Sequence, residues 1–120
     1  MYLSSILIAI VAILHLCFLV LEMFLWEKDV GRKIFSMSAD QAKQTSVLAK
    51  NQGLYNGFLA AGLIWTFFIQ DPGFQESARV FFLSCVIAAG VYGAFTAKRS
   101  ILYYQAMPAI LALLALKWSL

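Results

Sequence analysis

The sequence is poor in the residues from which most metal and redox sites are built. Its 120 residues include two cysteines and one histidine. Cys17 and Cys85 stand far apart in apolar segments, so there is no CxxC pair and no disulfide framework, and both are expected to be small buried hydrophobic side chains. Because one histidine cannot build the usual multi-histidine site, we predict no metal and no cofactor. Haem held by His15 alone is the alternative, which an absorbance spectrum would test.

Several motifs of nucleotide and nucleic-acid chemistry are also missing. The chain has no P-loop, no GxGxxG and no basic patch interleaved with aromatic residues. No serine has a convincing spacing to His15, which excludes a hydrolytic triad. Nucleic acid is therefore excluded as a partner. In addition, no loop is long enough to hold a soluble domain.

What the chain has instead is long apolar segments. Hydrophobic residues make up 62% of it, against about 45–50% in a typical soluble domain. About 20 apolar residues in a helix cross a hydrocarbon core of about 30 Å, and the fourth segment is slightly short of that length. We predict an all-α integral membrane protein, a single domain over 1–120 with up-down topology. Its four transmembrane helices are expected at 2–26, 46–70, 76–97 and 100–118.

Basic residues gather on one side of this predicted topology. The opposite side has only Arg79 and Lys117. Because Lys and Arg are retained in the cytoplasm, loop 27–38 and the third connection are expected to be cytoplasmic, with both termini outside. The first segment lacks a basic start and a cleavage site, so we read it as a retained span and not as a signal peptide. The basic residues of the cytoplasmic side are Lys28, Arg32, Lys33, Lys43, Lys50, Lys98 and Arg99.

Local signals mark the helix ends. Ser38-Ala39-Asp40-Gln41 has the form of a capping box, which predicts a helix beginning near Ala39. Asp71-Pro72-Gly73 is a turn sequence and predicts that this helix ends at Gln70. Lys98-Arg99-Ser100 leaves a very short connection, so the last two spans are expected to form an antiparallel hairpin.

Loop 27–38 contains Val30, Ile34 and Phe35 among its charges. It either lies on the membrane surface or is a solvated charged loop, and we favour the second interpretation. Small residues also predict close helix packing, because lipid gives no hydrophobic drive for helix contact. Whether they serve packing within one chain or a homodimer stays open. The two stripes of small residues are Gly53, Gly57 and Ala61, and Ala89, Gly93 and Ala97.

Polar residues inside apolar segments are the main functional clue, because they are costly in hydrocarbon. His15 and Glu22 are seven residues apart, so they share a helix face about 10 Å apart along the axis. Pro108 cannot donate a backbone hydrogen bond to the Tyr104 carbonyl, which leaves an acceptor there. We predict a polar pocket in the cytoplasmic half of the membrane, with His15 and Glu22 as acid/base residues. Its expected ligand-binding residues are Trp26, Asn51, Gln52, Tyr55, Asn56, Tyr92, Thr96, Tyr104 and Gln105.

A structural interpretation stands beside each of these assignments. Hydrogen bonds between helices account for His15, Asn51, Gln52 and Asn56 as well as contact with a ligand does. A buried bond to Asn51, Gln52 or a tyrosine would account for Glu22. Tyrosines at helix ends, such as Tyr103 and Tyr104, also serve as interfacial anchors.

The segment Asn51–Leu63, with its Asn-Gln-Gly-Leu-Tyr-Asn-Gly string, resembles a family of small bacterial membrane proteins defined as domain of unknown function number 1304. His15 and Glu22, Gly90–Gly93 and Gln105–Ala109 also match, and the resemblance covers essentially the whole chain. It implies a multi-pass protein of the bacterial cytoplasmic (inner) membrane and supplies no activity.

Three functions fit these residues. The first is binding of a small lipophilic ligand in the polar pocket, with isomerase-like proton transfer by His15 and Glu22 as its enzymatic form. The second is a small proton-coupled transporter acting as a dimer, with Glu22 as the coupling carboxylate. The third is a structural subunit of a membrane complex, which requires no chemistry.

Overall fold

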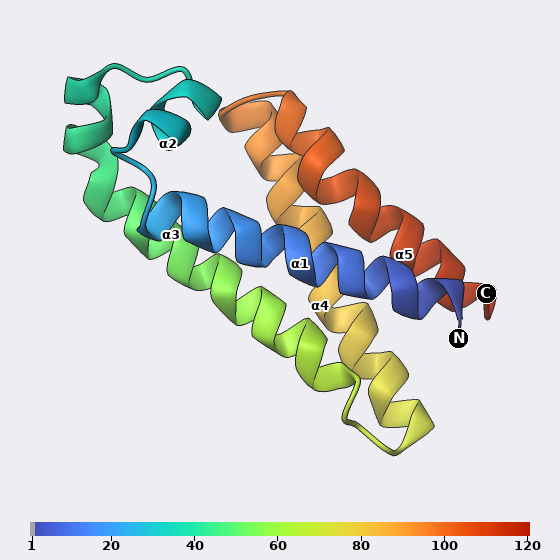
Figure 1. Ribbon diagram of the computed structural model, residues 1–120. Helices are drawn as coiled ribbons and strands as arrows, with labels where there is room; N and C mark the ends of the chain where they lie inside the picture. Colours follow the sequence, from blue (N-terminus) through green and yellow to red (C-terminus); the bar gives the residue numbers. More distant parts are fainter. Residues whose placement is uncertain (1) are drawn as a thin grey trace. The chain divides into compact units, whose positions relative to one another are not determined.

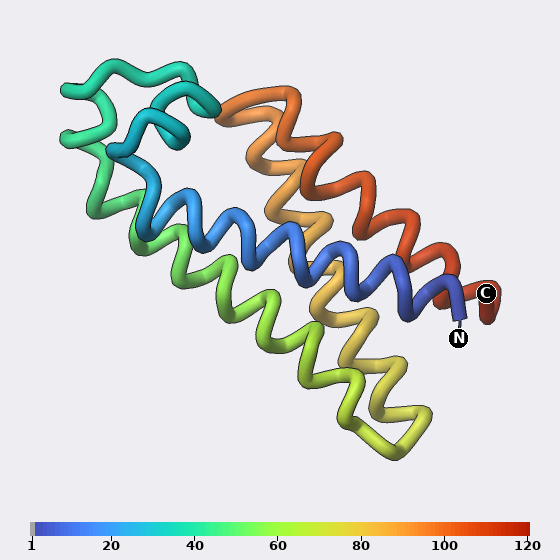
Figure 2. Tube along the Cα trace, in the orientation of Figure 1, coloured from blue at the N-terminus to red at the C-terminus, as the bar shows by residue number. Residues whose placement is uncertain are grey.

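The structure, a computed structural model, describes residues 2–120, and every regular element in that range is helical. The all-α prediction is therefore confirmed. Figures 1 and 2 follow these helices along the chain. In order they are α1 (Leu3–Met23), α2 (Asp29–Ile34), α3 (Ala39–Thr66), α4 (Pro72–Thr96), the π-helical turn η1 (Leu102–Ala106) and α5 (Met107–Lys117).

Of the helices within residues 2–120, α1 and α4 are long and apolar enough to cross a membrane. The prediction of four such helices is not confirmed. α3 is longer than either, but Lys50, Asn51, Gln52 and Asn56 lower the hydropathy of its membrane-length part. The last apolar stretch, Leu102–Lys117, is too short to meet the same length.

The start of α3 confirms the capping box. The Ser38 backbone N–H donates to Gln41 Oε1 at 2.9 Å, and the Gln41 N–H donates to Ser38 Oγ at 3.1 Å. These reciprocal bonds satisfy two of the N–H groups that a helix start leaves without partners.

The connection between α3 and α4 differs from the predicted one. α3 ends at Thr66 instead of Gln70, because the next three backbone N–H groups bond three residues back and tighten the chain into a 3₁₀-like turn. α4 begins at Pro72, earlier than the predicted residue 76. Asp71 accepts a bond from the Phe74 N–H at 2.8 Å, and Pro72 has the fixed φ that suits a first helical position.

The segment 27–38, which is expected to be a solvated charged loop, contains the short helix α2. Gly31 allows the helix to lie against the end of α1. A Cβ at this position would come within 2.0 Å of the Leu25 carbonyl oxygen, so no other residue fits without backbone movement. Val30 and Ile34 remain exposed.

Packing divides the chain into two compact units. The first unit contains the residues up to Leu14 together with Leu59–Leu120. The Ser4 N–H donates to the Leu120 carbonyl at 3.3 Å, so the two ends of the described chain meet (Figure 2). The core of this unit is formed by Ile8, Val11, Ala12, Leu63, Leu83, Val86, Ala109 and Ala112.

Within this unit α4 and α5 form the predicted antiparallel hairpin (Figure 1). A Cβ on Gly90 would lie 2.7 Å from the Ala106 backbone nitrogen, so the glycine lets η1 approach α4 at backbone distance. Gly93 lies against Ile101, whereas its predicted stripe partners Ala89 and Ala97 are exposed. The close contact is therefore made by Gly90, one position after the predicted Ala89.

η1 is the local consequence of Pro108. The Met107 N–H bonds to the Leu102 carbonyl five residues back, which widens the helix by one residue. A proline has no N–H, and its ring clashes with the carbonyl four residues before it. The widened turn relieves that clash, as π-helical turns do inside longer helices.

The second unit is His15–Phe58, which contains the end of α1, α2 and the first two thirds of α3. Cys17 lies here and is exposed, while Cys85 of the other unit is half-buried. The expectation that both cysteines are buried is therefore wrong for Cys17.

Candidate functional site

Two glycines bring α1 and α3 together in the unit His15–Phe58. A Cβ on Gly53 would lie 2.6 Å from Met23 Cγ, 3.1 Å from Glu22 Cβ and 3.3 Å from the Leu19 carbonyl oxygen. A Cβ on Gly57, one turn later, would lie 2.6 Å from Leu19 Cδ1. The Gly53–Gly57 stripe therefore packs within the chain, as small residues do where helix backbones approach closely.

This close approach places Asn56 beside Glu22. Asn56 is buried, with 5% of its surface exposed, and its Nδ2 donates a hydrogen bond to Glu22 Oε1 at 2.5 Å. The second carboxylate oxygen, Oε2, and the Asn56 amide oxygen have no hydrogen-bond partner within residues 2–120. The pair therefore presents two oxygen atoms to a group that donates hydrogen bonds.

His15 is fully buried and lies edge-on to the Phe18 ring, with 5.3 Å between the ring centroids. It is on the same helix as Glu22, seven residues earlier, which corresponds to about 10 Å along the axis. Direct proton transfer requires about 2.6–3.2 Å between heavy atoms. The two residues can therefore act on one ligand only if it extends along α1 between them.

Trp26 connects three segments of the same unit. Its indole Nε1–H donates to Thr45 Oγ1 at 3.0 Å, and its ring lies 4.8 Å from that of Phe35. Thr45 Oγ1 in turn donates to the Gln41 carbonyl at 2.7 Å. Since an indole has one donor, the polar atom of Trp26 is already used in holding the chain after α1 against α3.

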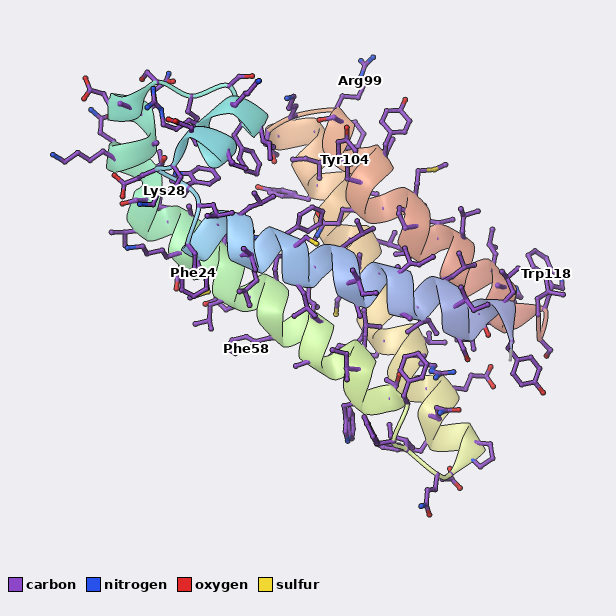
Figure 3. The ribbon with its side chains drawn as sticks, viewed as in Figure 1. Phe24, Lys28, Phe58, Arg99, Tyr104 and Trp118 are labelled. Atoms are coloured by element: carbon purple, nitrogen blue, oxygen red, sulfur yellow. The ribbon has the colours of Figure 1, made fainter. Side chains whose placement is uncertain are left out.

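The other predicted residues of α3 lie outside the Glu22–Asn56 contact. Asn51 and Gln52 are exposed. Tyr55 is exposed too, and its ring packs edge-on to Phe58 at 5.9 Å. Figure 3 shows Phe58 projecting away from α3. The structure thus unites Glu22 with Asn56 and leaves these three exposed neighbours outside that contact.

Four predicted residues belong to the other unit. Tyr92 and Thr96 are exposed, and the Thr96 hydroxyl donates to the Tyr92 carbonyl at 2.8 Å, a bond within the helix. Tyr104 is exposed and Gln105 half-buried, both on η1. Figure 3 shows Tyr104 near the turn that carries Arg99.

A shallow basic depression lies on α2, away from the predicted residues. Asp29, Arg32, Lys33 and Met37 line it. Arg32 Nε is buried and has no hydrogen-bond partner in the described part of the chain. In the same part, 2–120, no group of three or more His, Cys, Asp or Glu residues is placed to hold a metal ion.

Sequence reasoning missed a polar cluster at the turn between α3 and α4. Arg79, counted only as a charge on the opposite face, is buried and donates from Nε to Thr66 Oγ1 at 3.1 Å. Gln75 Nε2 donates to the Thr66 carbonyl at 2.9 Å. The four-residue spacing of Gln75 and Arg79 was the available signal, because it places both on one face of α4.

Comparison with known proteins gives a family and no activity. The family model "Protein of unknown function (DUF1304)" matches residues 9–117. The chain is 32% identical over 115 residues to "Uncharacterized protein YpaA" of Lactococcus lactis subsp. lactis (strain IL1403), covering 94% of this chain and 95% of that protein. No solved structure matches the chain.

Proposed function

The chain belongs to the DUF1304 family of proteins of unknown function, and from that premise we propose a function from its own residues. We propose a four-span protein of the bacterial cytoplasmic membrane. Its Glu22–Asn56 pair binds the polar end of a small lipophilic ligand.

Three features support the membrane part of the proposal. α1 and α4 are long and apolar enough to cross the bilayer. Many large apolar side chains of both are exposed, among them Ile13, Val20 and Phe81, which suits contact with lipid. Seven basic residues on one side against two on the other favour cytoplasmic placement of α2 and of the α4–η1 turn. In this arrangement the third and fourth spans are α3, which packs on α1, and η1–α5, which packs on α4.

The Glu22–Asn56 pair is the observation that carries the binding part. A carboxylate on an apolar helix is costly unless it is hydrogen-bonded, and Asn56 satisfies one of its oxygens. The free acceptor atoms, Glu22 Oε2 and Asn56 Oδ1, suit a ligand with a hydroxyl or amine group. Leu19 and Met23, which pack against the glycines next to this pair, are apolar and suit a hydrocarbon body.

The test is the set of small molecules that stays with the purified protein. The chain is purified in mild detergent, and the bound compounds are extracted and identified by mass spectrometry. We expect Glu22→Gln and Asn56→Leu each to lose a compound that the unsubstituted protein retains. Gln52→Leu is the matched control, because Gln52 lies one turn from Asn56 and is exposed. An identical set of compounds in all four proteins would contradict the proposal.

Binding, and not catalysis, is the function that the distances favour, since His15 and Glu22 lie about 10 Å apart along α1. Proton-coupled transport is the second candidate, because Glu22 is a carboxylate in the last turns of an apolar span. Proton uptake into liposomes that disappears in Glu22→Gln would support transport over simple binding.

A homodimer, if it forms, uses another surface than the Gly53–Gly57 stripe, which α1 of the same chain covers. Ala61, Ala89 and Ala97 are small and exposed, and we propose these positions for such a contact. Size-exclusion chromatography with light scattering, comparing Ala89→Leu with the unsubstituted protein, tests it.

A further inference from the structure

The cluster around Arg79 contains a buried cation without a counter-charge. Only 6% of the Arg79 surface is exposed, and residues 2–120 contain no ion pair with this guanidinium. The carboxylates close to Arg79 in the sequence do not pair with it. Asp71 accepts the bond from the Phe74 N–H that caps α4, and Glu76 is exposed. An arginine does not give up its proton in a protein, so the charge remains and needs a partner.

The contacts of Arg79 fix one end of the guanidinium and leave the other available. Nε donates to Thr66 Oγ1, and the guanidinium carbon lies 4.7 Å above the Phe67 ring. Thr66 is itself held by its bond to the Leu63 carbonyl at 2.6 Å. The two Nη groups have no partner in the described chain, and their paired N–H bonds match the oxygens of a phosphate or carboxylate.

The position of Arg79 along α4 indicates where such an oxyanion would lie. The 18 residues from Val80 to Ala97 carry no charge and extend about 27 Å as a helix, which nearly fills the hydrocarbon core. Arg79 therefore stands where the core ends, at the level of lipid phosphates. Exposed aromatic side chains surround the same turn, as they do at membrane interfaces: Trp65, Phe67, Phe68 and Phe74.

We propose that Arg79, held by Thr66 and Phe67, binds the phosphate of a phospholipid from the extracytoplasmic leaflet. This inference rests on the membrane location in the proposed function and is independent of the Glu22–Asn56 ligand. The lipid phosphate supplies the counter-charge that the chain lacks, while the aromatic side chains contact the glycerol region and the first methylenes.

The experiment measures lipid retention by native mass spectrometry of the detergent-purified protein. The probes are dioleoylphosphatidylglycerol, dioleoylglycerol with the same chains but no phosphate, and inorganic phosphate alone. We expect phosphatidylglycerol to be retained and to raise the melting temperature, and dioleoylglycerol and inorganic phosphate to do neither. Arg79→Gln should weaken retention at least about tenfold, as expected for loss of a charge-assisted contact. Arg99→Gln is the matched control, because Arg99 is exposed at the other end of α4.

Two further variants keep the test decisive if Arg79→Gln does not fold. Arg79→Lys keeps the charge without the paired N–H bonds, and Thr66→Val removes the anchor of Nε, so both should retain less phosphatidylglycerol. Unchanged retention in these variants overturns the proposal. So does equal retention of dioleoylglycerol, or stabilisation by inorganic phosphate alone, which would indicate a site for a free anion. Phosphatidylglycerol retention is scored here, and the compounds extracted to test the Glu22–Asn56 site are scored separately, so either proposal can fail without the other. Solubility of the chain without detergent would instead overturn the shared membrane premise.

Discussion

Asn56 and Glu22 are the residues on which the local polar chemistry of α1 and α3 depends. Asn56 is buried by the approach of α1 and places its amide donor on the carboxylate of a half-buried glutamate. Hydrogen bonds to charged groups contribute more to stability than neutral ones, about 1.5–3 kcal/mol. The pair therefore serves the packing of the two helices as well as the proposed ligand.

Replacement of Asn56 tests that contribution. Asn56→Leu keeps the side-chain size and removes the donor, so the free energy of unfolding should fall by about 1–3 kcal/mol. Unfolding in detergent micelles, followed by circular dichroism, measures the change. In a Glu22→Gln background the same replacement should cost less, because the charge is gone. Equal costs in the two backgrounds would show that the hydrogen bond does not couple the residues.

At the scale of elements, glycines decide which helices approach and how closely. The atoms that a new methyl group would meet differ between positions. At Gly90 they belong to the backbone and Cβ of Ala106, whereas at Gly57 the contact is the far end of the Leu19 side chain. A side-chain end can rotate away, but a packed helix backbone cannot move without disturbing its neighbours.

We therefore expect Gly90→Ala to lower the free energy of unfolding by about 1–3 kcal/mol. Gly57→Ala should cost less, because Leu19 can shift and because alanine is favoured over glycine in a helix by up to about 1 kcal/mol. Gly73→Ala is the control, since its new methyl group would meet only an ordinary contact at 3.5 Å from Asp71 Oδ2. Thermal unfolding of the three variants compares them. A cost at Gly57 equal to that at Gly90 would contradict the assigned contacts.

The N-terminus of α3 allows a second prediction at this scale. Ser38→Ala removes the hydroxyl that accepts from the Gln41 N–H, and such a change costs about 1 kcal/mol. Amide hydrogen exchange should accelerate at Gln41 and Ala42, within the first turn of α3. Unchanged exchange there would mean that the capping box is not formed in solution. Gln44→Ala, at an exposed position without such a bond, is the reference.

At the scale of the whole molecule, the proposed membrane sidedness is a prediction from the distribution of basic residues. The measurement places one cysteine at a time in a chain that also carries Cys17→Ala and Cys85→Ala. A maleimide that does not cross membranes then labels only the cysteines that lie outside the cell. Lys33→Cys, on α2, should be labelled only after cells are lysed, whereas Gly73→Cys, at the α3–α4 turn, should be labelled in intact cells. The physical reason is that basic loops are retained in the cytoplasm.

The reverse labelling pattern would invert the topology and place Arg79 at the cytoplasmic leaflet. Labelling of both positions in intact cells would contradict a bilayer between them. The reagent's access to the cytoplasm is checked with a soluble cytoplasmic cysteine protein in the same cells.

Much of the fold could be predicted because it depends on local signals. The capping box at Ser38 and the α4–α5 hairpin follow from short-range hydrogen bonds and chain length, and both are confirmed. Helix ends at Thr66 and Pro72 were predicted less well, since side chains from neighbouring segments, such as Gln75, contribute to the α3–α4 turn. Of the candidate site, the sequence placed His15 and Glu22 on one helix but could not choose which polar residues of α3 they face.

The sequence alone determined the helical class, the apolar character and the family, because composition and short motifs carry that information. Only the tertiary structure decided that Asn56, and not Gln52, contacts Glu22, and that Arg79 is buried without a carboxylate. The physical reason is the same in both cases. Which face of a helix is covered depends on where another helix can approach, and that distance is set by glycines and side chains far apart in the chain.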